Sequence, residues 1–174
     1  MVEHQVSTLG TRVRFPPPAL SIRAARDNEA DTLLAIQRSA CVVAFAHIFP
    51  PDRYPFPDDG VRAVWEEALH DPAVEAYVAE VTGEPVGSVS VGDGFLRTLY
   101  VLPLHWNAGI GTALHDLALE RLRAHGNTTA KLWTLEENWN SRHYYEKRGW
   151  ELTDETRVVP FPPNPIDVQY AKDL

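Results

Sequence analysis

This chain of 174 residues contains a single cysteine and a single methionine. The lone Cys41 excludes an internal disulfide, and its apolar neighbours indicate a packed thiol rather than a nucleophile. Basic residues are also scarce, because 16 Lys and Arg stand against 24 Asp and Glu and give a formal net charge of -8. This acidic balance argues against nucleic acid and against an anionic membrane as partners.

Long hydrophobic runs are missing as well. No stretch reaches the length of a membrane span, and the first residues lack the apolar core of a signal peptide, so we expect a cytoplasmic protein. No cluster of Cys and His has the spacing of a zinc site, so we expect no metal. The length and the apolar fraction of 44% predict one globular domain over residues 20–174.

The first residues, 1–19, differ from the rest of the chain. They show no hydrophobic periodicity and contain the three consecutive prolines 16–18, which is typical of an extended arm. The codons of Val13-Arg14-Phe15 can match the T-loop of a transfer RNA gene. We therefore hypothesise that this arm is upstream sequence rather than native protein.

Hydrophobic periodicity and turn residues divide the remaining chain into short elements. Strands are expected at 20–25, 76–81, 86–91, 95–101, 130–135, 150–159 and 166–172, and helices at 27–44, 60–69, 112–124 and from about 138. The turn Thr82–Pro85 predicts a hairpin between the second and third strands. Together these elements predict an α+β fold with a mixed, mostly antiparallel sheet flanked by helices.

The most informative segment is the glycine-bearing turn VLPLHWNAGIG, residues 101–111. It joins a strand to a helical pattern, so the free N–H groups of a helix start can converge there on an anion such as phosphate. A dinucleotide fingerprint would need a third glycine where the chain has Leu114, and a P-loop would need a Gly-Lys-Ser/Thr triplet that is missing. Taken alone, Gly109 and Gly111 favour a tight strand-to-helix turn of structural role over a phosphate site.

A second segment gives the turn a more specific meaning. Asn138 is followed at fixed spacing by Ser141, Tyr145, Gly149 and Trp150. The two segments together resemble the GNAT superfamily of N-acetyltransferases, in which V-x-P and [QR]-x-x-G-x-[GA] precede a helix and N-x-x-[AS]-x-x-x-Y-x-x-x-G-[FW] follows a later strand. This resemblance implies an α/β/α sandwich with a seven-stranded sheet and about four helices.

The resemblance implies that acetyl-CoA is the co-substrate. Backbone N–H groups of the turn would hold its pyrophosphate, the end of the preceding strand would pair with its pantetheine arm, and Asn138 would contact it from the other side. The implied cofactor-binding residues are Leu99, Tyr100, Val101, Trp106, Asn107, Ala108, Gly109, Ile110, Gly111, Thr112 and Asn138. Trp106 replaces the family's Gln or Arg and offers a phosphate neither an amide nor a guanidinium, so the backbone must do most of the binding.

Acyl transfer requires a group that protonates the departing thiolate, and the resemblance implies that Tyr145 is this general acid. Packing in the core is the alternative reading of Tyr145 and its neighbour Tyr144. The general base is open, because the strand that enters the turn carries no carboxylate where many relatives have a Glu. Asp93, which lies in a turn, and His47, which lies in an apolar stretch, are the two candidates. Ordered water, or an acceptor that arrives neutral, would make a protein base unnecessary.

In this family the first two helices and their connection shape the acceptor site. This implies substrate contacts from Phe45, His47, Tyr54 and Trp65, with packing in the core as the alternative. The expected function is acetyl transfer from acetyl-CoA to a primary amine by direct attack in a ternary complex. The missing carboxylate and Trp106 keep open a non-catalytic acyl-CoA-binding or regulatory domain. The sequence does not determine whether the acceptor amine is a small molecule or a peptide. It also does not determine whether the protein forms a homodimer.

Overall fold

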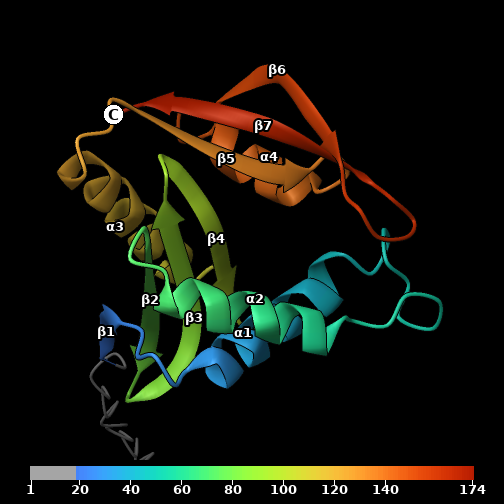
Figure 1. Ribbon diagram of the computed structural model, residues 1–174, viewed down its shortest axis with the longest axis horizontal. Coiled ribbons are helices and arrows are strands. Elements are labelled where there is room, and N and C mark those ends of the chain that lie inside the picture. Colours follow the sequence, from blue (N-terminus) through green and yellow to red (C-terminus); the bar gives the residue numbers. More distant parts are fainter. Residues whose placement is uncertain (1–18) are drawn as a thin grey trace, which may run out of the picture.

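The computed structural model describes residues 19–174, so the predicted arm lies outside the described residues apart from Ala19. Within the described part, seven strands form one sheet in the order β1-β2-β3-β4-β5-β7-β6, and four α-helices flank it (Figure 1). Neighbouring strands are antiparallel except for β4 and β5. The predicted α+β class and the mixed, mostly antiparallel sheet are therefore confirmed.

The elements lie close to their predicted positions. The strands are β1 (Leu20–Ala24), β2 (Val74–Val81), β3 (Glu84–Gly92), β4 (Phe95–Val101), β5 (Thr129–Leu135), β6 (Glu151–Val158) and β7 (Ile166–Asp173). The helices are α1 (Ala30–Ala44), α2 (Asp58–His70), the short 3-10 helix η1 (Pro103–His105), α3 (Ile110–Ala124) and α4 (Trp139–Glu146).

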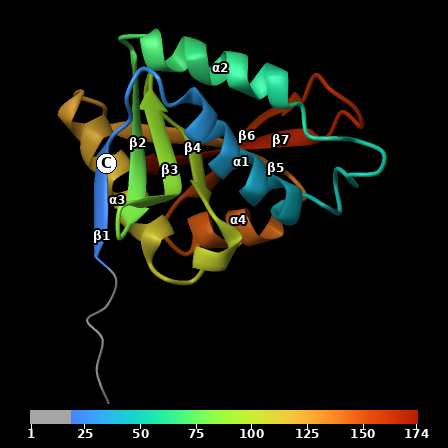
Figure 2. The same cartoon turned by 90° about the horizontal axis from the view of Figure 1, so that it is seen from below.

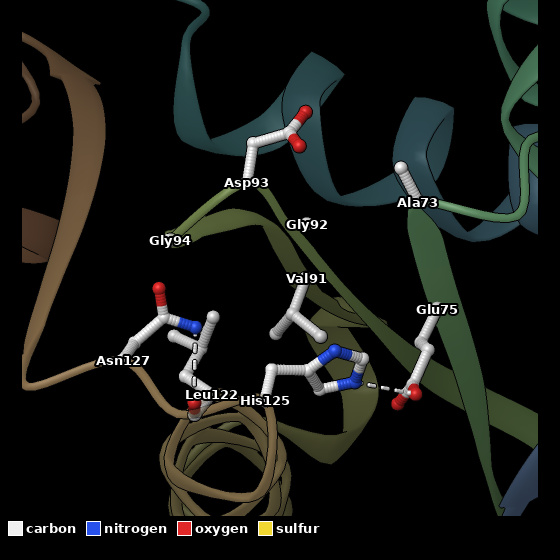
Figure 3. Close-up of a pocket in the computed structure, with 9 residues that line it drawn as sticks. All are labelled: Ala73, Glu75, Val91, Gly92, Asp93, Gly94, Leu122, His125 and Asn127. Carbon is white, nitrogen blue, oxygen red and sulfur yellow. Dashed lines mark hydrogen bonds and ion pairs between the residues drawn. The ribbon is translucent and has the colours of Figure 1, made fainter.

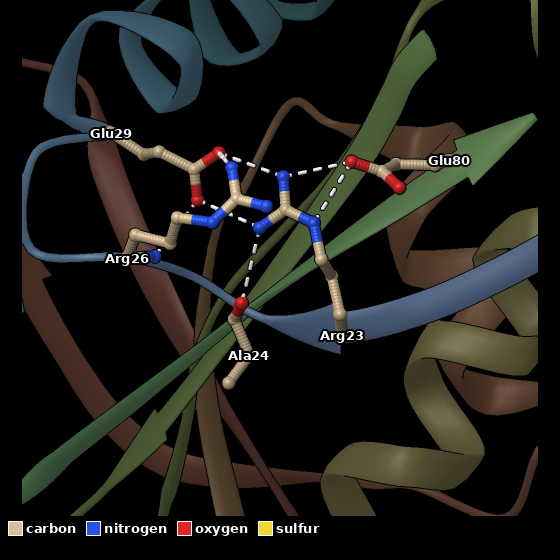
Figure 4. Close-up of polar contacts among 5 residues, drawn as sticks. All are labelled: Arg23, Ala24, Arg26, Glu29 and Glu80. Atoms are coloured by element: carbon tan, nitrogen blue, oxygen red, sulfur yellow. Dashed lines mark hydrogen bonds and ion pairs between the residues drawn. The ribbon is translucent and has the colours of Figure 1, made fainter. Parts of the chain in front are cut away.

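Helix α1 begins later than the predicted residue 27, because the preceding residues form a turn closed by Glu29. The carboxylate of Glu29 accepts from the backbone N–H of Arg26 at 2.8 Å and from the Arg23 guanidinium at 2.7 and 2.8 Å. Arg23 also donates to Glu80 at 2.9 Å (Figure 4). The Arg23 hydrogen bond is the largest influence on Glu29 and lowers the pKa of its carboxyl to about 2. This charged cluster ties β1 to β2 and to the start of α1.

The hairpin between β2 and β3 is tighter than predicted. Thr82 and Gly83 both have positive φ, 51° and 84°, which is the geometry of a two-residue type I′ turn. Glu84 and Pro85 therefore belong to β3 instead of the turn, and the ladder accommodates Pro85 at a bulge beside Glu80.

Strands β4 and β5 form the feature that positions the site, because they separate along their length. Their parallel pairing consists of Phe95 with Lys131, near the start of both strands. Beyond this point the sheet divides into β1 to β4 and β5 to β7, as Figure 1 shows. The carboxyl end of β4 leads into the glycine turn, and the carboxyl end of β5 leads into α4.

The helices cover both faces of the sheet, which confirms the sandwich. Helices α3 and α4 share one core with β3 and β4, in which Leu114 packs with Val89 and Tyr145. Helices α1 and α2 cover the opposite face through a second core around Leu33 and Trp65. A third, smaller cluster joins the α1–α2 connection to the end of β5 and to the chain after β6, through Ile48, Leu135 and Val159.

Candidate functional site

The turn between β4 and α3, residues 102–109, is called the phosphate turn below. Asn107 and Gly109 are both left-handed, with φ of 60° and 83°, and Gly109 is the N-cap of α3. Helix α3 begins at Ile110, two residues earlier than predicted, because the left-handed Gly109 lets the chain enter the helix at once. A Cβ built at Gly109 would meet no atom within 4 Å, so the turn is open on this side.

The first turn of α3 leaves backbone donors free. No side chain caps the helix, and the first main-chain bond into it runs from the N–H of Ala113 to the carbonyl of Gly109 at 3.1 Å. The N–H groups of Ile110, Gly111 and Thr112 consequently have no intrahelical acceptor. They point out of the positive end of the helix dipole, which is an arrangement that binds anions.

The open edge of β4 adjoins this turn. Leu102 donates to the carbonyl of Val86 in β3 at 2.8 Å. Because main-chain groups alternate between the two edges of a strand, Val101 and Leu99 turn theirs away from β3, toward the side where β5 has separated. An extended ligand could pair with the backbone there, as the sequence predicted for the pantetheine arm.

Trp106 braces the turn. Its indole N–H donates to the carbonyl of Val101 at 2.7 Å, while 42% of the residue stays exposed. The polar group of this side chain is therefore used inside the turn. This placement agrees with the expectation that Trp106 gives a phosphate no polar contact.

Asn138 is the N-cap of α4 and is buried. Its side-chain carbonyl accepts from the N–H of Ser141 at 3.4 Å, and its amide donates to the Ser141 hydroxyl at 2.7 Å and to the Thr134 hydroxyl at 3.4 Å. These contacts fix the start of α4 against β5. The predicted contact of Asn138 with a cofactor stays a prediction.

Tyr145 lies on the buried face of α4 and is 8% exposed. Its ring packs edge-on against Tyr144 and Trp150, with centroids 5.3 and 5.8 Å away. Burial raises the pKa of the Tyr145 hydroxyl well above its ordinary value, so the phenol keeps its proton at neutral pH and can act as a donor. Tyr100 lies at the end of β4, and burial is the main cause that raises the pKa of its hydroxyl. A charge on the nearby Tyr145 raises the pKa of Tyr100 further.

His115 supports Tyr145 from α3, a contact that sequence reasoning missed. The Trp150 indole donates to Nε2 of His115 at 2.9 Å, so Nδ1 carries the imidazole proton and faces the Asp116 carboxylate at 3.0 Å. Burial lowers the pKa of His115, which keeps the ring neutral. The signal in the sequence was its spacing, because His115 precedes Ala118 by three residues and Leu119 by four, which places it on the buried face of α3.

The two predicted base candidates lie far apart. Asp93 is exposed in the turn before β4 and lies 3.9 Å from the Arg97 guanidinium. It lines a pocket of about 270 Å³ with Glu75, His125 and Asn127 (Figure 3). The whole of β4 separates it from the phosphate turn, roughly 20 Å for a seven-residue strand.

His47 lies on the α1–α2 connection, at the opposite end of β4 from Asp93. Its Nε2 is 2.9 Å from the carbonyl of Glu137, the residue before the N-cap of α4. An N–H at Nε2 donates to this carbonyl, which leaves Nδ1 of the neutral ring as the basic nitrogen. The structure therefore brings His47, and not Asp93, to the end of α4 where Asn138 lies.

The predicted acceptor residues divide between the loop and the core. Phe45 packs against the small cluster beside His47. Tyr54 lies further along the connection, with the Arg53 guanidinium 5.8 Å from its ring. Trp65 is 3% exposed and donates its indole N–H to Gln37 at 2.8 Å, so its packing matches the core alternative.

Comparison with known proteins places this arrangement in a family. The sequence profile of the acetyltransferase (GNAT) family matches residues 42–150, more than half of the chain. The chain therefore belongs to this family, and the matched segment contains the phosphate turn, Asn138 and Tyr145.

One relative in Methanocaldococcus jannaschii is described as an uncharacterized N-acetyltransferase. It is 30% identical over 86 residues, which span 43% of this chain and 38% of that protein. The match thus spans well under half the length of this curated relative, so its whole activity does not transfer with the similarity.

Solved structures share the fold. A GCN5-related N-acetyltransferase from Rhodopseudomonas palustris superposes with a TM-score of 0.72 at 19% identity, covering 94% of this chain and 99% of that one. The PaiA N-acetyltransferase of Thermoplasma acidophilum, solved with coenzyme A, gives 0.66 at 16% identity over 90% and 99%. YncA from Salmonella typhimurium, solved with its cofactor acetyl-CoA, gives 0.66 at 18% identity over 90% and 94%.

Residues 19–174 contain neither a membrane-spanning helix nor a cluster of metal ligands. None of the helices there is both long and apolar enough to cross a membrane. Among the same residues, no group of three or more His, Cys, Asp and Glu side chains is arranged to hold a metal ion.

Proposed function

We propose that this protein transfers an acetyl group from acetyl-CoA to a primary amine by direct attack in a ternary complex. The observation that carries the proposal is the uncapped start of α3, whose free N–H groups lie beside the open edge of β4. Two relatives of the same fold were solved with coenzyme A or acetyl-CoA, which supports the choice of co-substrate.

The residues present fit coenzyme A. Backbone N–H groups of the phosphate turn and of Ile110 to Thr112 would hold the pyrophosphate, and the open side at Gly109 leaves room for it. The outward main-chain groups of Leu99 and the outward N–H of Val101 would pair with the pantetheine arm, because the Val101 carbonyl already accepts from Trp106. When bound, acetyl-CoA supplies an acetyl group already activated as a thioester.

Tyr145 would complete the transfer as general acid. As the amine nitrogen bonds to the acetyl carbon, the carbon–sulfur bond breaks and its electron pair goes to sulfur. The Tyr145 hydroxyl gives that sulfur its proton, and burial keeps the hydroxyl protonated until this moment.

The amine must lose a proton, and His47 is the better placed of the two base candidates. Its Nδ1 is free to accept a proton while Nε2 is held by the Glu137 carbonyl. Histidine is the side chain that most often serves as a general base in enzymes. The acidic chain, with a net charge of -8, suits a cationic acceptor of small-molecule or peptide type.

The test is release of free thiol from acetyl-CoA with a panel of amines, including polyamines, amino acids, lysine peptides and peptide N-termini. We expect thiol release that depends on both the protein and one class of amine. Titration calorimetry with acetyl-CoA, run in parallel, measures binding independently of turnover.

A second candidate is a non-catalytic acyl-CoA-binding or regulatory domain. It is favoured by the sequence of β4, which carries no carboxylate. Tight binding of acetyl-CoA without thiol release from any amine would support this candidate over the first.

A further inference from the structure

Two side chains four residues apart, Tyr144 in α4 and Arg148 just after it, reach the first turn of α3. The Arg148 guanidinium, just past the end of α4, donates to the Thr112 hydroxyl at 2.8 Å and to the carbonyl of Tyr144 at 3.1 Å. It also lies 3.6 Å from the centroid of the Tyr144 ring. Figure 2 shows where α3 and α4 lie relative to the sheet.

The hydroxyl of Tyr144 is also directed at this place. It lies 3.8 Å from the position that a Cβ at Gly111 would take. The oxygen is buried and lies near the Thr112 hydroxyl, but it makes no well-formed hydrogen bond among the described residues. An unpaired buried hydroxyl is unfavourable, so this group is ready for an acceptor that the protein itself does not supply.

The charge of Arg148 is unbalanced in the same way. None of the ion pairs among residues 19–174 includes Arg148, and both of its acceptors are neutral oxygens. A cation at the N-terminus of a helix is repelled by the helix dipole. The free protein therefore carries a cost at this position that a bound anion would remove.

We propose that Arg148 and the Tyr144 hydroxyl bind the pyrophosphate of coenzyme A together with the backbone of the phosphate turn. Arg148 thus supplies, from α4, the cation that Trp106 does not supply from the turn. Stacking on Tyr144 holds the guanidinium in place, which lowers the entropy lost on binding. This inference rests on the proposed function only in its choice of ligand.

The experiment measures the Kd for coenzyme A by titration calorimetry, with no acceptor present. We expect Arg148→Gln to weaken binding by about 10- to 100-fold, as for loss of a charged hydrogen bond. Arg148→Lys keeps the charge but loses the planar fork, so its loss should be intermediate. Tyr144→Phe should weaken binding by about 3- to 10-fold. Arg123→Gln, with the same loss of charge at the exposed far end of α3, is the matched control and should bind normally.

Two comparisons make the test decisive. Dephospho-coenzyme A lacks the 3′-phosphate but keeps the pyrophosphate. If Arg148→Gln weakens binding of this ligand as much as binding of coenzyme A, the pyrophosphate assignment is supported. If Arg148→Gln no longer weakens binding, the assignment is overturned.

Thermal unfolding of the free proteins should show Tyr144→Phe and Arg148→Gln at least as stable as the parent. Lower stability with an unchanged Kd would mean that both residues are merely structural. Failure of acetyl transfer with normal binding would overturn the proposed function and leave this inference standing.

Discussion

The two ends of β4 each adjoin a turn with left-handed residues. Asp93 and Gly94 precede the strand, and Asn107 and Gly109 follow it. The backbones are similar in kind, yet the polar groups around the two turns behave in opposite ways.

At the first end, the polar groups satisfy one another. The Glu75 carboxylate accepts from Arg121 at 2.8 and 3.0 Å, from Tyr77 at 2.7 Å and from His125 at 2.7 Å, and Figure 3 shows the last of these beside Asp93. The Arg121 hydrogen bond is the main cause that lowers the pKa of Glu75 to about 2.

At the second end, donors are left over. Helix α3 has no side-chain cap, the Tyr144 hydroxyl makes no well-formed hydrogen bond among the described residues, and Arg148 is bonded to neutral oxygens. The comparison teaches that the polar side chains of the first pocket already satisfy one another, whereas the donors beside the open strand edge are the groups from which we propose a binding site.

The largest expected difference between the two ends of β4 is obtained by placing the same side chain in both turns. Gly109→Asp should weaken coenzyme A binding by about 100-fold or more, because its carboxylate would face the open side next to the free N–H groups and repel the pyrophosphate. Gly94→Asp puts equal charge and similar backbone strain at the first turn, with φ of 80°, and should leave the Kd unchanged. Equal losses in the two variants, measured by calorimetry, would remove the distinction between the ends.

Tyr145→Phe tests the chemistry at the second end. We expect kcat to fall by about 100-fold while the Kd for acetyl-CoA stays within about twofold, because only the proton donor is lost. Tyr77→Phe changes a tyrosine at the first end and is the control. A kcat unchanged by Tyr145→Phe would exclude the general-acid role.

The two candidates for the general base allow a further test of the two ends of β4, because Asp93 lies at the first end and His47 at the second. His47→Gln should lower kcat/KM by about tenfold or more, and the loss should diminish as pH rises and more of the amine is already neutral. Asp93→Asn should leave kcat/KM within about twofold. The opposite ranking in initial-rate measurements would assign the base to Asp93.

The smallest effect is expected at Glu75. Its folded pKa of about 2 lies below the ordinary 4.5, so its contribution to stability is complete above about pH 4.5 and is lost as pH falls through about 2. Glu75→Gln should therefore lower the urea midpoint at pH 7, by less than about 1 M, and the difference from the parent should shrink in acid. Urea titrations at pH 7 and pH 3 check this, and a difference that grows in acid would contradict it.

Local patterns in the sequence carried most of the fold. The pattern of apolar residues located β4 at residues 95–101 as observed, and the predicted turn Thr82–Pro85 located the hairpin, although only Thr82 and Gly83 form its loop. The start of α1 was misplaced, because the turn that delays it is closed by Arg23 from a separate element. Periodicity contains no information on such a contact.

The candidate site was predicted in part for the same reason. The spacing of the glycines and of Asn138 and Tyr145 brought the correct segments together, because each motif occupies one turn and one helix. Arg148 and His115 were missed, since their partners lie in other elements, 36 and 35 residues away in sequence.

The sequence by itself determined the strand, the glycine turn and the helix that follow one another at the phosphate turn, because neighbouring residues control φ, helix start and strand alternation. Only the tertiary structure decided which donors remain unpaired. That depends on which groups another element brings within hydrogen-bond distance. The Glu75 carboxylate meets donors from β2 and α3, while Arg148 finds only neutral oxygens near the start of α3 and the Tyr144 hydroxyl makes no well-formed hydrogen bond there. The separation of β4 from β5 leaves that end open, and it is set by how the two halves of the sheet pack.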